Sequence, residues 1–321
     1  MNLRAYIIRR AVTLFVVFLI ILSINFMIFR LLPGDPVRSL FQDPRLDPED
    51  REQIAQLFGL DKPIWVQYLL YMKNALVGEL GMSFTYRQPV WDIVAEKLEN
   101  TIILVGSAAV LAFVLGITTG IVAAWRRKTA TDFGILGTSL FLYSVPTFWL
   151  GMMLLFALGG IVPSAGMYTL GAVYDGPFDK FADLLKHLAA PVIVLTCVLF
   201  GQYVMLMRSS LIDVLQEDFI VTARAKGMRE RFLLRRHAFP NAMLPIVTIT
   251  AINMGFIVGG AIQTETIFSW PGVGRLMFDA LMARDYPILQ GCFIITTLAV
   301  LVANFVVDIT YVFLDPRVRI G

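Results

Sequence analysis

The chain has 321 residues, of which 57% are hydrophobic and only 16% are charged. Ordinary soluble domains have roughly 45–50% apolar and about 25% charged residues, and the mean hydropathy here is +0.72. This composition excludes a disordered chain and a soluble enzyme, and solid apolar runs in place of alternating ones exclude a β-barrel. The net charge of +3 says little by itself, whereas the positions of the charges say more.

Several apolar runs of about 20 residues are each long enough, at ~1.5 Å per residue, to cross a ~30 Å hydrocarbon core. The first run follows several arginines, as in a signal peptide, but it is too long for a signal core and no small-residue cleavage site follows it. We therefore predict an all-α polytopic membrane protein with six transmembrane helices, at Ala11–Phe29, Ile102–Ala124, Ile135–Leu158, Leu188–Met207, Ile246–Ile262 and Ile288–Phe313.

Lysines and arginines gather before the first run and after the second, fourth and sixth runs. Because cytoplasmic loops carry an excess of these residues, an even number of spans with both termini in the cytoplasm is expected. The sequence divides into an N-terminal segment with the first span (1–30), an extracytoplasmic helical lobe (31–100) and a five-helix core (101–321). The core contains the long cytoplasmic loop 208–245.

The lobe carries helix signals. Asp47-Pro48 is typical of a helix start and Gly59 of a helix end. After Pro63, apolar residues at helical spacing predict a second helix, and Gln88-Pro89 predicts a short helix that runs into the second span. The lobe either caps the helix ends or docks an external partner, and the sequence leaves both interpretations open.

Small residues at Gly116-x-x-x-Gly120 and Gly255-x-x-x-Gly259 permit close approach between helices. Cys197 and Cys292 both lie in apolar runs, which disfavours a disulfide or a thiolate metal site. The chain also has no phosphate-binding Gly-x-x-x-x-Gly-Lys-Ser/Thr loop and no paired histidines. We therefore predict no catalytic residue, no bound metal and no cofactor for this chain.

Ionisable groups within a span are costly and usually functional. Asp308 and the nearby Asn304 form a candidate intramembrane polar site in the sixth run. The favoured interpretation is structural, with Asp308 paired to a cation such as Arg317. The alternative is a proton relay in an ion-coupled secondary transporter, which would be expected to carry more such groups or broken helices.

The cytoplasmic loop is the most informative segment, with 7 basic and 4 acidic residues from Arg208 to Pro245. Leu211, Leu215, Phe219 and Ala223 follow helical spacing, with Asp218 as a candidate N-cap. The helix would stop at Gly227 and resume from Phe232 to His237 at a new angle. Such an elbow could transmit a push from a cytoplasmic partner into the bundle, or it could be a solvated surface loop.

The segments Asp218–Met228 and His237–Ala242 resemble the cytoplasmic EAA loop of ABC-importer permeases, and more narrowly that of the dipeptide/oligopeptide/nickel permease family. The family pattern is Glu-Ala-Ala, three residues, Gly, nine residues and Ile-x-Leu-Pro. Ala223, Gly227 and Pro240 match this pattern.

Val221 and Thr222 stand where the family has Glu and the first Ala, so the salt bridge of that glutamate is not carried over. His237 and Phe239 replace Ile and Leu. The resemblance continues through nearly the whole chain, at Tyr6–Arg10, Leu32–Pro36, Phe58–Pro63, Gly78–Ser83, Glu265–Arg275, Arg284–Pro287, Asp308–Tyr311 and Leu314–Arg319.

The resemblance implies a non-catalytic permease subunit that imports short peptides across the bacterial cytoplasmic (inner) membrane, surrounded by lipid and with no role for nucleic acid. It implies a heterodimer with a second permease, two ATPase subunits that hold ATP and Mg²⁺, and an external substrate-binding protein. The same architecture imports nickel, glutathione or another small solute, and the chain does not decide between these cargoes.

By the same resemblance, the helix around Asp218–Gly227 would dock in a groove of the ATPase, where Ala223 and Gly227 stay small so that the surfaces can meet. The residues assigned to this coupling loop are Asp218, Thr222, Ala223, Arg224, Lys226, Gly227 and Pro240. A second segment, with its Pro-Gly turn, would shape an external gate or simply connect two helices. Its residues are Phe268, Trp270, Pro271 and Gly272.

Overall fold

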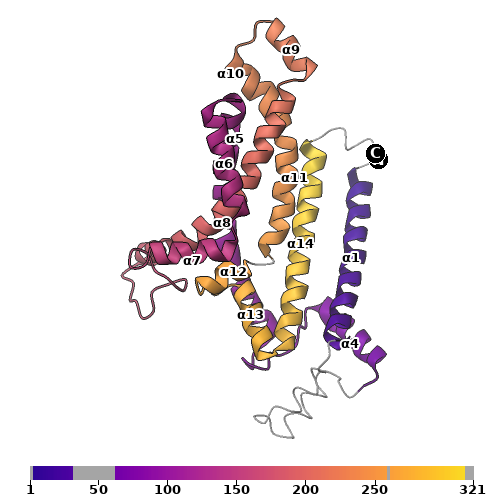
Figure 1. The fold of residues 1–321 in the computed structure, drawn as a ribbon. Helices are drawn as coiled ribbons and strands as arrows, with labels where there is room; N and C mark the ends of the chain where they lie inside the picture. Colours follow the sequence, from indigo (N-terminus) through magenta and orange to yellow (C-terminus); the bar gives the residue numbers. More distant parts are fainter. Residues whose placement is uncertain (1–2, 32–61, 259–260, 315–321) are drawn as a thin grey trace. The chain divides into compact units, whose positions relative to one another are not determined.

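The structure is a computed structural model that describes residues 3–31, 62–258 and 261–314, and all named elements in these ranges are helices (Figure 1). The chain forms two compact units, one of Met1–Glu99 with Gly272–Gly321 and one of Asn100–Pro271. The all-helical class predicted from the sequence is confirmed. The division into N-terminal segment, lobe and five-helix core stays a prediction.

In the first unit, α1 (Leu3–Leu31) packs along α14 (Tyr286–Leu314), and α4 (Ile64–Val77) packs across α1 (Figure 1). The first turns of α5 (Val90–Trp125) and the whole of α13 (Val273–Ala283) complete this unit. Apolar side chains from these helices form a continuous buried cluster. Its members include Phe29, Val90, Val94, Leu276, Ile288 and Cys292.

The Asp285 carboxylate joins two parts of this unit that lie far apart in the sequence. It accepts hydrogen bonds from Ser83 Oγ at 2.6 Å and from the Thr85 amide at 2.9 Å. Its other oxygen accepts from the Ile288 amide, in the first turn of α14. Because an acidic side chain before a helix satisfies amides that have no partner in the helix, Asp285 both starts α14 and anchors the loop before α5.

Two of the helix predictions for the lobe are tested by the structure. The helix predicted after Pro63 is confirmed as α4, which ends at Gly78 with φ +82°. The helix predicted to begin at Gln88-Pro89 and run into the second span is confirmed in its start, but it is not short, because α5 begins at Val90 and runs unbroken to Trp125. The helix predicted between Asp47 and Gly59 lies outside the described residues.

In the second unit, the predicted span Ile135–Leu158 is wrong as a single helix. It is divided into α6 (Ala130–Ser144) and α7 (Thr147–Ala157), which meet at an angle of 102°. The reason is Pro146, which has no amide hydrogen and disfavours a helical backbone at the residue before it. That residue, Val145, is extended with ψ 128°.

The remaining helices of the second unit surround α8 (Pro177–Val214), which packs against α6, α7 and α11. The predicted close approach at Gly116 and Gly120 is confirmed, because a methyl group at either position would fall within 3 Å of the Cβ of Tyr203 or Met207 on α8. The side chains around the second predicted pair, Gly255 and Gly259, lie outside the described residues.

A series of short helical segments with one long helix follows α8. It consists of α9 (Asp218–Ala225), α10 (Glu230–Leu233), the π-helical turn η1 (Leu234–Ala238), α11 (Phe239–Val258) and α12 (Ile262–Ile267). The predicted fifth span, 246–262, coincides with most of α11, which begins several residues earlier because the π-helical turn leads directly into it.

Four helices among the described residues are long and apolar enough to cross a membrane, or five if α6 and α7 form one broken span. They contain the predicted first, second, fourth and sixth spans. The structure therefore confirms a multi-pass membrane protein, whereas the count of six stays a prediction.

Candidate functional site

The helix α9 lies at one end of the second unit, next to α10 and beyond the ends of α8 and α11 (Figure 1). The helical spacing of Leu211, Leu215, Phe219 and Ala223 does not run through one helix, because α8 ends at Val214 and the backbone is extended at Glu217. Asp218 is consequently the first helical residue of α9 and not its N-cap. An acidic residue in this first turn still favours the helix through the helix dipole.

The two faces of α9 differ in what they contact. Ile220 and Ala223 are buried, whereas Phe219 and Val221 are 43% and 55% exposed. The predicted apolar face through Phe219 is therefore wrong, because the break before α9 changes which residues face inward. Thr222 is also exposed, so α9 presents a mixed apolar and polar surface outward.

The buried face of α9 is continuous with the interior of the second unit. Ile220 and Ala223 belong to one apolar cluster with side chains of α5, α8, α10 and α11. This cluster includes Ile117, Met207, Leu211, Leu233, Ala242 and Ile246. Since close-packed interiors transmit strain, a displacement of α9 would be felt by the long helices of this unit. Because Ala223 is small, α9 can pack closely against this cluster.

An ion pair holds α9 to α10. Arg224 donates to both carboxylate oxygens of Glu230, at 2.9 and 3.3 Å. This hydrogen bond raises the pKa of Arg224 above its usual value. A bidentate pair fixes geometry as well as charge, although both side chains are close to half exposed. Arg224 thus fixes the angle of the elbow within this chain.

Gly227 ends the elbow helix. Its φ of +75° is in the left-handed region that L side chains rarely adopt, and nothing lies within 4 Å of the position of an added Cβ. The Met228 amide closes the end by donating to the Ala223 carbonyl at 3.3 Å. Within this chain, Gly227 is thus required for its conformation.

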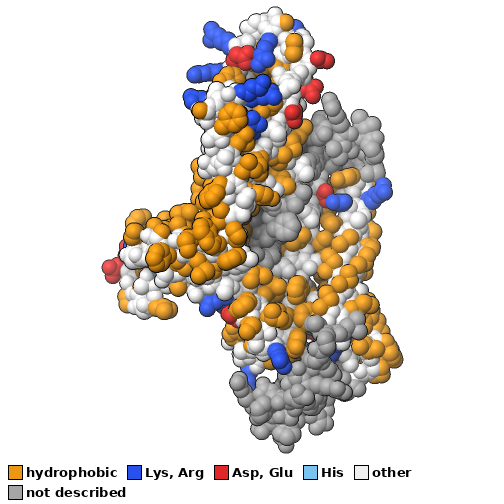
Figure 2. All heavy atoms as spheres, viewed as in Figure 1, with side chains coloured by type: hydrophobic (Ala, Val, Ile, Leu, Met, Phe, Trp, Pro, Cys, Tyr) orange, Lys and Arg blue, Asp and Glu red, His pale blue; other side chains and the backbone are white. Residues whose placement is uncertain are grey.

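The other predicted coupling residues lie nearby in the sequence but not all on one element. Lys226 is the exposed C-cap of α9, and Pro240 is exposed in the first turn of α11. Basic side chains gather over the end of the unit that carries α9 and α10 (Figure 2). The exposed ones are Arg224, Lys226, Arg229, Arg231, Arg235 and Arg236.

The segment predicted as an external gate is a buried corner. Phe268 and Trp270 are 2% and 0% exposed. Trp270 Nε1 donates to the Asn100 carbonyl at 2.9 Å, and the Asn100 amide donates to the Pro271 carbonyl at 3.0 Å. Gly272 follows as the N-cap of α13. A gating role stays a prediction and would require this hydrogen-bonded corner to move.

Glu265, one turn before Trp270, was not predicted as a site residue. It is fully buried and accepts a hydrogen bond from Thr101 Oγ1 at 2.8 Å. Glu265 belongs to the same sequence motif as the predicted gate residues, which is the one signal that could have indicated it. Its burial with a hydrogen-bond donor identifies it as part of the corner that fixes α12 to the start of the second span.

Asp308 pairs with Arg10 across α1 and α14. The predicted partner Arg317 lies outside the described residues. Arg10 is therefore the cationic partner that the structural interpretation of Asp308 requires. The neighbouring Asn304 is partly buried on the same helix. An ion pair between two helices is what the structural interpretation of Asp308 predicts.

The second unit thus has an elbow of α9 and α10 that packs continuously with its long membrane-spanning helices. The family model for the inner membrane component of binding-protein-dependent transport systems matches residues 116–320, and the model for the N-terminal part of such components matches residues 3–105. The chain belongs to this family, the permease subunits of ABC importers.

Curated relatives extend over almost the whole chain. The dipeptide transport system permease protein DppB of Escherichia coli K12 is 36% identical over 98% of both chains. The oligopeptide transport system permease protein AppB of Bacillus subtilis is 35% identical over 98% of this chain and 99% of its own. The di/tripeptide transport system permease protein DppB of Pseudomonas aeruginosa is 36% identical over 98% of both chains.

Among solved structures, a chain of the MetNI methionine ABC transporter in an inward-facing conformation has a similar fold. The TM-score is 0.57, and the match covers 70% of this chain and 96% of that one. With 14% sequence identity, this likeness concerns the fold. The family membership establishes a multi-pass transport permease of the inner membrane.

Proposed function

We propose that this permease subunit passes short peptides across the cytoplasmic membrane, driven by separate ATPase subunits. The support for the cargo is the near full-length similarity to proteins named as dipeptide, di/tripeptide and oligopeptide permeases. ATP and Mg²⁺ would be bound by the ATPase subunits, and an external binding protein would deliver the peptide. A second, homologous permease would complete the pathway as a heterodimer.

The observation that carries the coupling mechanism is the division of α9 into two faces. Phe219, Val221 and Thr222 face outward and would enter a groove of the ATPase subunit, while Ile220 and Ala223 face the helices of the second unit. Closure of the ATPase dimer would thereby move α9 and bias the spans between inward-open and outward-open states. Exposed cations such as Lys226 would make charge contacts with the ATPase, whereas Arg224 is paired with Glu230 within this chain.

This proposal places the α9 end of the second unit in the cytoplasm. The support is the concentration of exposed arginine and lysine at this end, since basic residues are retained on the cytoplasmic side. Both termini would then be cytoplasmic, and the lobe with α4 would face the binding protein. Phe268, Trp270, Pro271 and Gly272 would form part of the external gate.

An ion-coupled mechanism through Asp308 is not favoured, because Asp308 is paired with Arg10 and the family couples transport to a binding protein and an ATPase. Nickel, glutathione and other small solutes remain alternative cargoes within the same architecture. They are distinguished by direct competition with a labelled dipeptide.

The test is peptide uptake by proteoliposomes that contain the purified complex. We expect ATP-dependent accumulation of a labelled dipeptide in the presence of the binding protein, and none with this chain alone. Uptake by the lone chain under a proton gradient would contradict the proposal. Uptake of nickel or glutathione, but not dipeptide, by the ATP-driven complex would refute the cargo and leave the mechanism in place.

A further inference from the structure

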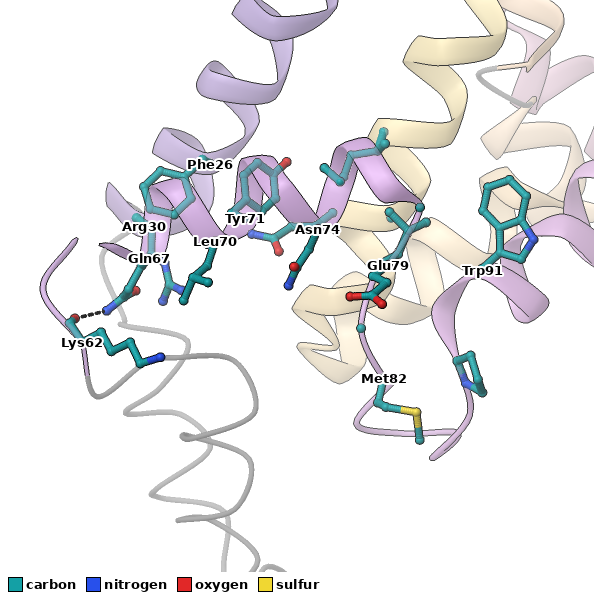
Figure 3. A pocket seen from close by; sticks show the side chains of 18 residues that line it. Phe26, Arg30, Lys62, Gln67, Leu70, Tyr71, Asn74, Glu79, Met82 and Trp91 are labelled. Atoms are coloured by element: carbon teal, nitrogen blue, oxygen red, sulfur yellow. Dashed lines mark hydrogen bonds between the residues drawn. The ribbon is translucent and has the colours of Figure 1, made fainter. Parts of the chain in front are cut away.

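The first unit contains a cavity of about 620 Å³ between the end of α1, α4, the start of α14 and the loop before α5 (Figure 3). The coupling mechanism makes no use of it. Lys62, Glu79, Met82 and Trp91 line it and are exposed, so the cavity reaches the surface. A cavity of this size with convergent polar groups is a candidate ligand site.

The charges of the lining are separated. Arg30 and Lys62 lie on one side of the cavity and Glu79 lies on the other (Figure 3). The side-chain amides of Gln67 and Asn74 also line the cavity, and Gln67 Nε2 donates to the Lys62 carbonyl at 2.7 Å. This arrangement complements a zwitterion, with its anionic group toward the two cations and its cationic group toward Glu79.

The cavity lies where two spans end. Phe26 and Arg30 belong to the last two turns of the span Ala5–Arg30, and Gln290 and Ile294 to the first turns of the span Tyr286–Val306. These positions correspond to the level of lipid headgroups. The guanidinium of Arg30 lies over the Phe26 ring at 5.6 Å from its centroid, so the cation is held at this level.

Tyr71 and Trp91 also line the cavity, as expected at a membrane interface, where aromatic side chains are enriched. The helices beside the cavity offer apolar surface to hydrocarbon chains. On α1, Met27 and Ile28 are 56% and 51% exposed, and on α4, Leu69 is 58% exposed. Figure 2 shows hydrophobic side chains along the exposed face of α1. A ligand with a zwitterionic head and apolar tails therefore fits better than a wholly soluble one.

We propose that this cavity binds the headgroup of a phospholipid that carries a phosphate and a primary amine, such as phosphatidylethanolamine. Arg30 and Lys62 bind the phosphate, since charge-assisted hydrogen bonds to phosphate are strong. Glu79 accepts hydrogen bonds from the ammonium group, which a quaternary amine cannot donate. The acyl chains lie along the exposed apolar residues of α1 and α4. This site does not depend on the identity of the transported solute.

The test is native mass spectrometry of the delipidated full chain, titrated with phosphatidylethanolamine, phosphatidylcholine or phosphatidylglycerol of identical acyl composition. We expect phosphatidylethanolamine to bind about tenfold more tightly than the other two, the change that loss of one charged hydrogen bond produces. Glu79→Gln should reduce phosphatidylethanolamine binding to the level of phosphatidylcholine without weakening phosphatidylglycerol binding. Arg30→Gln and Lys62→Gln should weaken all three lipids.

Two matched control variants each remove one charge of the same sign at a position outside the cavity. Lys73 is an exposed cation on α4 and Glu99 an exposed acid on α5, and neither lines the cavity. Lys73→Gln and Glu99→Gln should leave lipid binding unchanged. Thermal stability of each variant, measured in the same detergent, shows whether a loss of binding reflects the site or the fold.

Three results would overturn the proposal. One is equal binding of phosphatidylethanolamine and phosphatidylcholine by the wild-type chain. Another is unchanged phosphatidylethanolamine binding in Glu79→Gln. The third is displacement of bound lipid by a soluble dipeptide or by glycerophosphoethanolamine at equal concentration, which would make the cavity a site for soluble zwitterions. None of these results affects the uptake assay for the proposed transport function.

Discussion

The contact between α5 and α8 at Gly116 gives a prediction whose magnitude follows from the geometry. A Cβ at this position would lie 2.4 Å from the Cβ of Tyr203, about 1 Å closer than the ~3.5 Å at which two carbon atoms attract each other. Tyr203 cannot rotate away, because its Cβ is fixed to the backbone of α8. Its ring also packs edge-on against Phe113, and the side chain is 1% exposed.

The matched control is on the same helix. An added Cβ at Gly106 would meet nothing within 4 Å. Alanine favours a helix over glycine by about 1 kcal/mol at either position, so this gain cancels when the two variants are compared. Overpacking a tight contact costs about 1–3 kcal/mol. Gly116→Ala should therefore be less stable than Gly106→Ala by that amount.

The assay is thermal unfolding of the purified variants in one detergent, followed by size-exclusion chromatography of the fraction that stays dispersed. A difference of about 1–3 kcal/mol predicts a midpoint roughly 3–10 °C lower for Gly116→Ala than for Gly106→Ala. Equal midpoints for the two variants would refute the reasoning, because they would mean that α5 and α8 separate without cost.

The remaining predictions concern the elbow and an ion pair. Gly227→Ala should reduce ATP-driven uptake with little loss of folded protein, because a left-handed backbone costs alanine about 1–2 kcal/mol; uptake equal to wild type would contradict the role assigned to φ +75°. Arg224→Glu should reduce uptake without lowering the unfolding midpoint, and adding Glu230→Arg should restore it, whereas failure of this rescue would refute the pairing. Asp132→Asn should destabilise the chain by about 3 kcal/mol in thermal unfolding, because Arg208 donates two hydrogen bonds to this buried carboxylate; an unchanged midpoint would contradict this.

The helices were predictable because a bilayer allows few alternatives to apolar helices of about 20 residues. The break at Pro146 was missed, although the proline stands in the middle of the predicted third span. Counting apolar residues measures whether a segment prefers lipid, but it does not measure whether the backbone can continue as one helix. The preference of the residue before proline for an extended backbone was the available signal.

The orientation of α9 was missed for a different reason. The spacing of Leu211, Leu215, Phe219 and Ala223 is helical, but these residues lie on two different helices. A non-helical residue at Glu217 starts a new helix with a new phase, so Ile220 is buried in place of Phe219. Periodicity predicts a face only within an unbroken helix.

Side-chain pairs between residues far apart in the chain could not be predicted from the sequence. Asp308 and Arg10 are 298 residues apart, and Asp285 and Ser83 are 202 residues apart. In each pair both residues lie in segments whose resemblance to the family was noted, but one sequence contains no signal that joins them. Their pairing depends on how α1, α5 and α14 pack together.

The proposed coupling mechanism depends most on which face of α9 meets the ATPase subunit. In a variant with both native cysteines replaced by alanine, a single cysteine is placed at Val221, which is 55% exposed, or at Ala223, which is 7% exposed. A short thiol-reactive cross-linker should join the Val221→Cys variant to the ATPase in the assembled complex, and Ala223→Cys should give little or no product. Cross-linking at Ala223→Cys with none at Val221→Cys would contradict the account.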